Sequence, residues 1–199
     1  MTENFEPKRF IVKSNELPEL YPTNFHSSKF WEALGRTVAT FGFLEEVLGK
    51  AIFAFTGTKE YKENEVDAAY KLWLPTLKRA LSDPLGGLID TYAKAVREHP
   101  KATVTNLNEL VNDLRQASVI RNVLCHGSWR PPNNEGKSIP LYVNRKGEIF
   151  DTAFDVSSLE LLQKSVTELV CAVVNTVTHM GWQFPGSNGP GSVVFKNRN

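Results

Sequence analysis

The sequence predicts a mainly α-helical protein: a bundle of four to five helices with a small β-hairpin inserted before the last helix. Three observations support this fold class. Apolar residues recur at steps of three and four along several long stretches, which is the periodicity of helices buried on one face. Gly and Pro punctuate the segments between these stretches. The chain has 199 residues, 41% of them hydrophobic, which suits a single hydrophobic core.

Both ends of the chain are predicted to lie outside the bundle. Residues 1–27 contain three prolines that interrupt any helical run, so we expect an extended N-terminal arm. Residues 182–199 are rich in Gly and Pro, which predicts a flexible C-terminal tail. The helical domain is therefore expected to span residues 28–181.

Three helices are expected in the first half of this domain. The first covers residues 29–55, and its apolar stripe includes one carboxylate, Glu45. The second begins near Asn64, and Pro75 within it predicts a kink or a break. A shorter third helix is expected over residues 88–98, between a Gly-rich corner and a proline.

The fourth helix has the strongest periodicity in the chain. Its apolar stripe runs from Leu107 to Leu124, and Gly127 provides a stop signal. Thr103 or Thr105 is the expected N-terminal cap.

A β-hairpin and a final helix complete the predicted domain. Two short runs with strand character cover residues 139–154, joined by the turn-forming segment 144–147. Asp155 or Ser157 is expected to cap the last helix, which ends at Gly181.

Charge and composition exclude several classes of function. The chain carries 23 Lys+Arg and 22 Asp+Glu, so its net charge of +1 excludes a chain-wide basic field for nucleic acid, although not a local basic site. Cys125 and Cys171 lie far apart, without the spacing of a structural zinc site. The N-terminus lacks an apolar signal core, and no apolar run reaches the roughly 20 residues that cross a bilayer. We therefore expect a cytoplasmic protein with no membrane partner.

Residues with useful chemistry gather at the end of the fourth helix. Asn122 and His126 are four positions apart and share a helical face, while Arg121 lies on the adjacent flank. Arg can bind a phosphate through two hydrogen bonds, Asn can hold a phosphate oxygen or a ribose hydroxyl, and His can move a proton near neutral pH. No carboxylate cluster accompanies them, so we predict neither a metal nor a cofactor.

The same residues also have a purely structural interpretation. Arg and His in a last helical turn before Gly form an ordinary helix ending. Arg121 occupies the apolar stripe of its helix, where an unpaired charge is costly. Because Glu45 lies on an apolar stripe as well, a structural Glu45–Arg121 ion pair stays open as the alternative.

The segment Arg121-Asn122-x-x-x-His126-Gly127, at the end of a bundle helix, resembles the signature of the HEPN superfamily. In that family an Arg is followed after four to six residues by His, and the residue after Arg is usually polar. The long first helix with an acidic residue in its middle is also similar to an HEPN bundle. The resemblance implies a metal-independent endoribonuclease. His126 would act as general acid/base on the ribose 2′-hydroxyl or the leaving oxygen, Arg121 would stabilise the phosphate charge, and Asn122 would position the phosphate.

The resemblance also implies partners. Family members commonly form homodimers in which two motifs face one cleft, they leave a 2′,3′-cyclic phosphate on the cleaved RNA, and many serve as toxins or antiviral defence effectors. RNA, a second copy of the chain and an antitoxin protein are therefore the expected partners. Other members are non-catalytic modules that bind nucleotide, RNA or protein, which is the alternative function. A plain structural or assembly protein is a third possibility.

Two residues after the motif could extend a binding surface. Trp129 could stack on a base and Arg130 could contact a phosphate. Packing of Trp129 against the predicted hairpin is the favoured interpretation, because a large aromatic side chain more often fills a core. Glu45 is assigned a supporting role beside Arg121.

Overall fold

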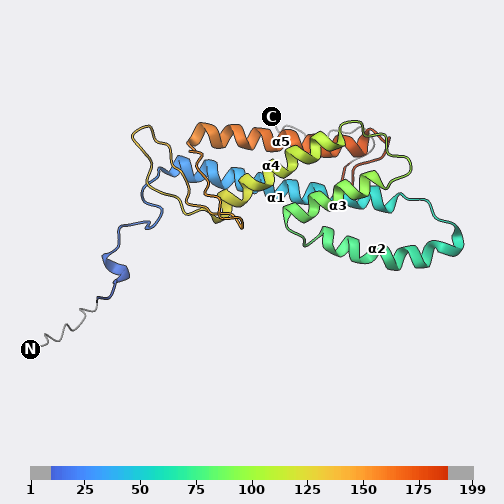
Figure 1. The fold of residues 1–199 in the computed structure, drawn as a ribbon, viewed down its shortest axis with the longest axis horizontal. Helices are drawn as coiled ribbons and strands as arrows, with labels where there is room; N and C mark the ends of the chain where they lie inside the picture. The colour runs from blue at the N-terminus through green and yellow to red at the C-terminus, as the bar shows by residue number, and fades with distance from the viewer. Residues whose placement is uncertain (1–9, 188–199) are drawn as a thin grey trace, which may run out of the picture.

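The first helix contacts every other α-helix of the described chain. The computed structural model describes residues 10–187, and within them five α-helices form an elongated bundle (Figure 1). They are α1 (Ser28–Gly57), α2 (Val66–Ala80), α3 (Leu85–Arg97), α4 (Leu107–His126) and α5 (Val156–Thr178). Short 3-10 turns, η1 (Ser14–Glu16) and η2 (Glu63–Glu65), precede α1 and α2. Each of the other four α-helices packs against α1, which confirms the predicted helical bundle.

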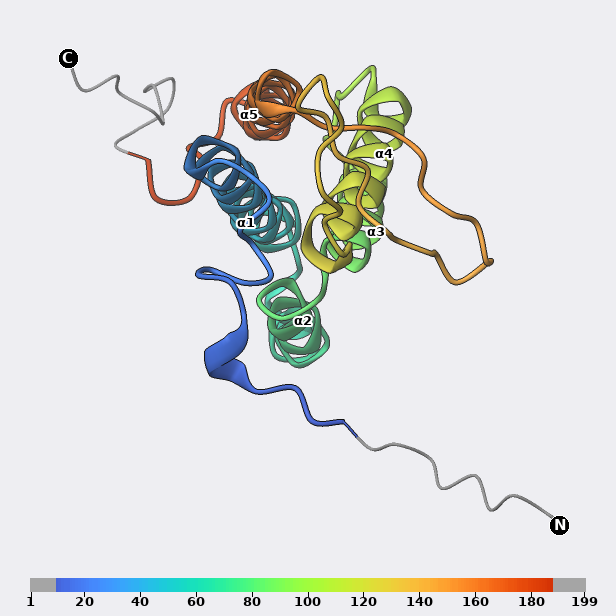
Figure 2. The same ribbon diagram turned by 90° about the vertical axis from the view of Figure 1, so that its left-hand side faces the viewer.

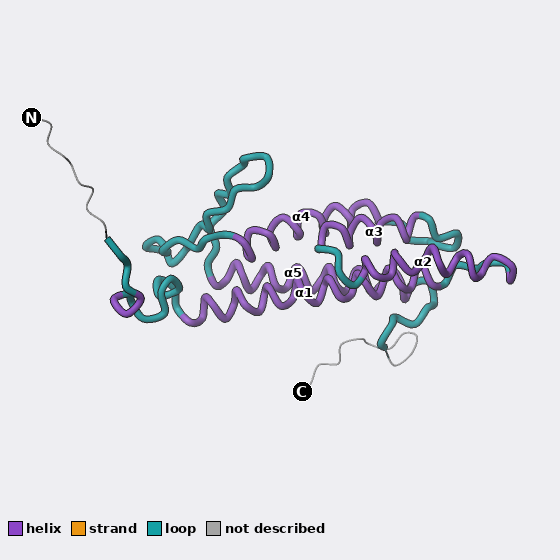
Figure 3. The backbone as a smooth tube through the Cα atoms, turned by 90° about the horizontal axis from the view of Figure 1, so that it is seen from below, coloured by secondary structure: helices purple, strands orange, loops and turns teal. Residues whose placement is uncertain are grey.

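The helices form two layers. α1 and α5 run side by side in the same direction and make the first layer, and α3 and α4 make the second (Figures 2 and 3). α2 lies at the edge of the bundle, against α1 and α3. The core between the layers contains the long apolar side chains of α1 and α5, among them Leu44, Leu48 and Val173, each fully shielded from solvent. Burial of such a side chain contributes about 1.5–3 kcal/mol.

Local sequence signals account for most helix ends. Ser27 caps α1, because its hydroxyl oxygen accepts a hydrogen bond from the Phe30 amide at 3.3 Å. Asp155 caps α5 as predicted, and it forms a reciprocal capping box with Ser158. The predicted cap of α4, Thr103 or Thr105, is wrong, because the N-cap of this helix is Asn106. The Thr105 hydroxyl instead donates to the Asn106 side-chain oxygen at 2.6 Å.

α2 is an unbroken helix that is only partly packed against the bundle. It continues through Pro75 without a break, and Ala80 is its one buried residue. Its apolar side chains at Tyr70 and Leu72 are exposed. Trp73 attaches the helix to α1, because its indole N–H donates to the Thr56 hydroxyl at 2.7 Å. The helical periodicity of α2 thus marks a helix that is only partly covered.

The predicted β-hairpin over residues 139–154 is wrong. Within the described residues this region forms only isolated bridges, such as Val143–Ile149, and Figure 3 draws it as loop. The turn itself is present, since the Asn144 side-chain oxygen accepts hydrogen bonds from the amides of Lys146 and Glu148. The pairing stays short. Val143 and Ile149 beside the turn are both exposed, and a two-stranded ribbon is marginal by itself, although Phe150 and Phe154 further along pack on the core.

Both chain ends contact the bundle before they leave the described region. Residues 10–27 contain no α-helix, in line with an extended arm, and the Thr23 carbonyl accepts a hydrogen bond from the Trp31 indole. At the other end Phe184 is buried, and Trp182 packs edge-on against Phe55. The first residues of the predicted tail are therefore part of the core. The predictions for residues 1–9 and 188–199 lie outside the described residues.

Candidate functional site

The last turn of α4 carries the predicted site residues. His126 is the final residue of the helix and is exposed, while Asn122 is half-buried one turn earlier. Gly127 ends the helix with an amide that donates to the Val123 carbonyl at 2.8 Å. A Cβ at Gly127 would lie 2.6 Å from that carbonyl oxygen and 2.8 Å from Pro140 Cβ. Only glycine permits so close an approach, so the chain turns sharply and leaves His126 at the surface.

The loop that follows is fastened beside the motif. Ser128 and Leu141 exchange two backbone hydrogen bonds of 3.0 and 2.8 Å. The Ser138 hydroxyl donates to the Arg130 carbonyl, and Ser138 is itself buried. These bonds hold the loop against the end of α4, so the position of His126 is fixed from both sides.

Arg121 forms the ion pair with Glu45 that the two apolar stripes suggested. Arg121 Nη2 lies 3.2 Å from Glu45 Oε1, and each side chain is 26% exposed. Oε1 is shielded from solvent, yet no donor is aligned with it for a hydrogen bond. The contact is therefore a charge pair with poor hydrogen-bond geometry. A guanidinium has five N–H donors, so this single contact leaves others for a phosphate.

Trp129 and Arg130 point to different roles. Trp129 is half-buried and packs edge-on against Phe30 at a centroid distance of 5.0 Å and against Phe154 at 6.0 Å. Trp129 therefore packs between the first turn of α1 and the segment just before α5. Arg130 is exposed and lies in the loop that follows the motif. The structure thus joins Arg121 to Glu45, places Asn122 and His126 on the last turns of the same helix, and gives Trp129 a packing role.

Two other histidines, His99 and His26, occupy defined environments. His99 is buried; its Nδ1 accepts the Lys101 amide at 3.2 Å, and its Nε2 lies 3.3 Å from the Thr58 hydroxyl. Burial lowers the pKa of His99 below its ordinary value. His26 stacks on Phe30, and burial lowers its pKa as well. Neither lies on a periodic stripe, so no sequence pattern predicts its environment.

The described residues contain no group of three or more His, Cys, Asp and Glu side chains arranged to hold a metal ion. Nor does any helix within them combine the length and apolar content that crossing a membrane requires. Comparison of the chain with protein-family models, with curated proteins and with solved structures finds no match.

Proposed function

We propose that this chain is a metal-independent endoribonuclease of the HEPN type. The observation that carries the proposal is the exposed His126 at the end of α4, within two turns of a cation and an amide. Gly127 and the Ser128–Leu141 bonds fix the backbone that follows this histidine, and the histidine stays exposed. An exposed imidazole at a helix end that also carries a guanidinium is suited to proton transfer at a phosphodiester.

The proposed reaction is an internal displacement at phosphorus. The ribose 2′-oxygen forms a bond to phosphorus, the bond to the 5′-oxygen breaks, and the products are a 2′,3′-cyclic phosphate and a 5′-hydroxyl. His126 accepts the 2′-hydroxyl proton or delivers a proton to the leaving oxygen. Arg121 stabilises the negative charge on the non-bridging oxygens, and Asn122 donates a hydrogen bond that positions the phosphate.

We further propose that the active form is a homodimer in the cytoplasm. One copy offers a single histidine at an open helix end, whereas base and acid must act on opposite sides of the phosphorus. Two copies that share a cleft supply both. A role as a toxin or antiviral effector, held inactive by an antitoxin protein, fits such an enzyme.

The test is an RNA-cleavage assay in EDTA with end-group analysis. The wild type should cleave and leave 2′,3′-cyclic phosphate, while His126→Ala and Arg121→Ala should each lose roughly 10²–10⁴-fold in rate. His179→Ala is the matched control, because His179 is exposed at the end of α5. Equal activity in all four proteins would refute the assignment, and activity lost in EDTA would refute the metal-free mechanism.

The Arg121–Glu45 ion pair favours a second candidate, a non-catalytic module that binds nucleotide, RNA or protein. A guanidinium that neutralises a neighbouring carboxylate is less available to a phosphate. In that case the wild type should bind labelled RNA without cleaving it, and His126→Ala should bind equally well. Glu45→Gln should then strengthen RNA binding, since it releases Arg121 from its partner.

A further inference from the structure

The surface between α4 and α5 is a groove that no element of the described chain covers. It holds about 860 Å³. Its floor is apolar and comes equally from both helices, with Leu110, Ala117 and Ile120 on α4 and Leu162, Leu169 and Ala172 on α5. The small side chains of Ala117 and Ala172 leave room where two packed helices would normally interlock. Arg121 points instead toward α1, so this α4–α5 groove is separate from the candidate site.

The rim of the α4–α5 groove is acidic. Glu109 and Asp113 line it from α4 and Glu168 lines it from α5, and no Lys or Arg is among the residues that line it. All three carboxylates are exposed. Apolar side chains extend beyond the floor, since Val119 is 56% exposed within the groove and Leu161 is 65% exposed beside it. An apolar floor with a rim of one charge is a recognition surface rather than an ordinary solvated face.

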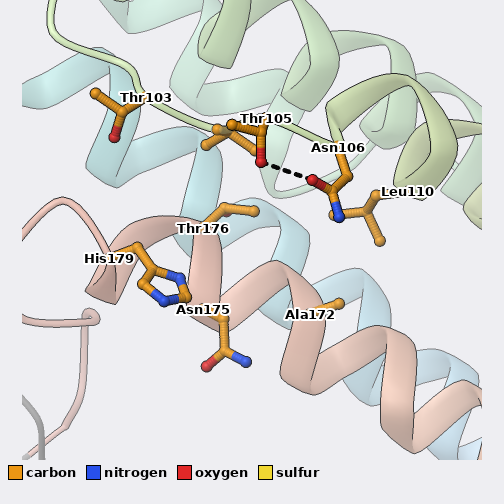
Figure 4. Close-up of a pocket in the computed structure, with 9 residues that line it drawn as sticks. Thr103, Thr105, Asn106, Leu110, Ala172, Asn175, Thr176 and His179 are labelled. Carbon is orange, nitrogen blue, oxygen red and sulfur yellow. Dashed lines mark hydrogen bonds between the residues drawn. The ribbon is translucent and has the colours of Figure 1, made fainter.

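The groove continues into a polar pocket at its far end, shown in Figure 4. Asn106, Leu110 and Ala172 line both hollows, and the end pocket adds Asn175, Thr176 and His179. From Leu162 to His179, α5 extends about 25 Å at 1.5 Å per residue, the length of a helix of about 17 residues. The hydroxyl and carboxamide groups of the end pocket can hydrogen-bond the backbone groups that a helix terminus leaves free.

We propose that the α4–α5 groove binds a basic amphipathic helix of a partner protein. The apolar stripe of such a helix lies on the floor between α4 and α5, and its flanking Lys or Arg side chains face the rim carboxylates. The partner completes a three-helix arrangement that this chain leaves open on one side. This binding does not depend on whether His126 is catalytic.

The charge on the rim decides against two other occupants. RNA would bring phosphates against Glu109, Asp113 and Glu168, and the like charges would repel. A second copy of this chain, docked through a two-fold axis, would place the same acidic rim against itself. A basic partner is the occupant that this rim attracts.

The experiment uses the full-length chain and two synthetic peptides of about 18 residues that form amphipathic helices. Both carry the same leucine stripe, one with lysines and the other with glutamates on its polar face. Fluorescence anisotropy of labelled peptide should show that the lysine peptide binds at least about tenfold more tightly than its acidic twin. Equal binding of the two would overturn the proposal.

Two variants locate the binding. The triple variant Glu109→Gln, Asp113→Asn, Glu168→Gln should weaken lysine-peptide binding about tenfold or more. Its control, Glu63→Gln, Asp67→Asn, Asp151→Asn, removes the same charge from exposed positions outside the groove and should bind as the wild type. Ala172→Phe fills the groove and should also weaken binding. Thermal melts show that each variant is folded.

Three results would count against the groove as a partner site. The two triple variants could bind alike, which would mean that net charge alone attracts the peptide. An RNA oligonucleotide could displace the peptide, which would assign the groove to nucleic acid. Ala172→Phe could abolish self-association in sedimentation equilibrium, which would assign it to a second copy of the chain.

Discussion

At the scale of single residues, Arg121 and Glu45 join the candidate site to the core. The pair links α4 to α1, and both side chains are three-quarters covered. A charge in such a position is costly when its partner is removed, although partial exposure screens the interaction. Loss of either residue therefore alters stability as well as chemistry, and activity data on Arg121 need a stability measurement beside them.

We predict a modest coupling between these two residues. In a double-mutant cycle with Arg121→Met and Glu45→Gln, the coupling free energy should be about 1 kcal/mol, because the pair lies between surface and buried pairs in exposure. Methionine keeps the packing of the Arg stem. Urea unfolding of the four proteins measures the coupling. Additive effects would show that the 3.2 Å contact contributes nothing to stability.

His99 predicts a dependence of stability on pH. Its acceptor bond from the Lys101 amide requires an unprotonated Nδ1, and burial lowers its pKa from the ordinary value of 6.5. The unfolded chain therefore binds a proton more readily than the folded one. The contribution of neutral His99 is complete above about pH 6.5 and is lost as the pH falls through the lowered pKa.

The measurement is urea unfolding between pH 7.5 and pH 5. Wild type should lose stability on acidification, and His99→Gln should lose less over the same window. His26→Gln isolates the second histidine whose pKa burial lowers, and the exposed His179→Gln should match wild type. A His99→Gln profile parallel to wild type would contradict the assignment. Asp155 does not affect this comparison. The hydrogen bond from the Ser158 amide lowers the pKa of its carboxyl from 3.8, which is below the pH window of the measurement.

At the scale of elements, two glycines of α1 give a matched pair. A Cβ at Gly49 would lie 2.8 Å from the carbonyl oxygen of Ala80, at the end of α2, whereas a Cβ at Gly42 would meet nothing within 4 Å. Gly49→Ala should destabilise the protein by about 1–3 kcal/mol, because backbone must move. Gly42→Ala should stabilise it by up to about 1 kcal/mol through helix propensity. Thermal unfolding compares them, and a stabilised Gly49→Ala would show that α2 shifts freely.

The elements that sequence predicted best are those specified by local signals. α1, α4 and α5 combine a periodic apolar stripe with a glycine stop or a capping residue, and these act within a few residues of each other. The hairpin prediction failed because an isolated two-stranded ribbon is marginal, and residues 139–154 pair only through isolated bridges. Asn106 is the N-cap of α4 in place of the threonines, and its side-chain oxygen accepts from the Thr105 hydroxyl instead of capping the helix.

The candidate site was predictable to the same degree. Arg121, Asn122 and His126 belong to one helix end, so their spacing alone brings them together. The contact with Glu45 needed two apolar stripes to face each other, which the sequence indicated as one alternative. The α4–α5 groove was not predictable, because it arises from the packing of α4 and α5 and from two alanines between them.

At the scale of the whole molecule, the even charge balance of 23 cations and 22 anions constrains how RNA can be held. Nine Lys and Arg side chains of the described chain form ion pairs, as Arg115 does with Asp90 and Lys50 does with Glu46. The acidic rim of the α4–α5 groove repels phosphates from that surface. The proposed enzyme should therefore contact few phosphates, chiefly through Arg121 and Arg130 of each copy.

This gives a prediction for the salt dependence of RNA binding. With two to four phosphate contacts in a dimer, the slope of log K against log salt should be roughly −1.4 to −2.8 for single-stranded RNA. Affinity should then fall roughly 7- to 50-fold between 50 and 200 mM salt, compared with the roughly 10³- to 10⁵-fold loss that six to ten contacts produce. Filter binding with the His126→Ala variant measures the slope without cleavage. Arg130→Ala should make it shallower, while Arg36→Ala, which removes an exposed cation paired with Glu32, should leave it unchanged. A steep slope would mean that RNA is gripped along an extended surface, which is incompatible with a compact cleft at the end of α4.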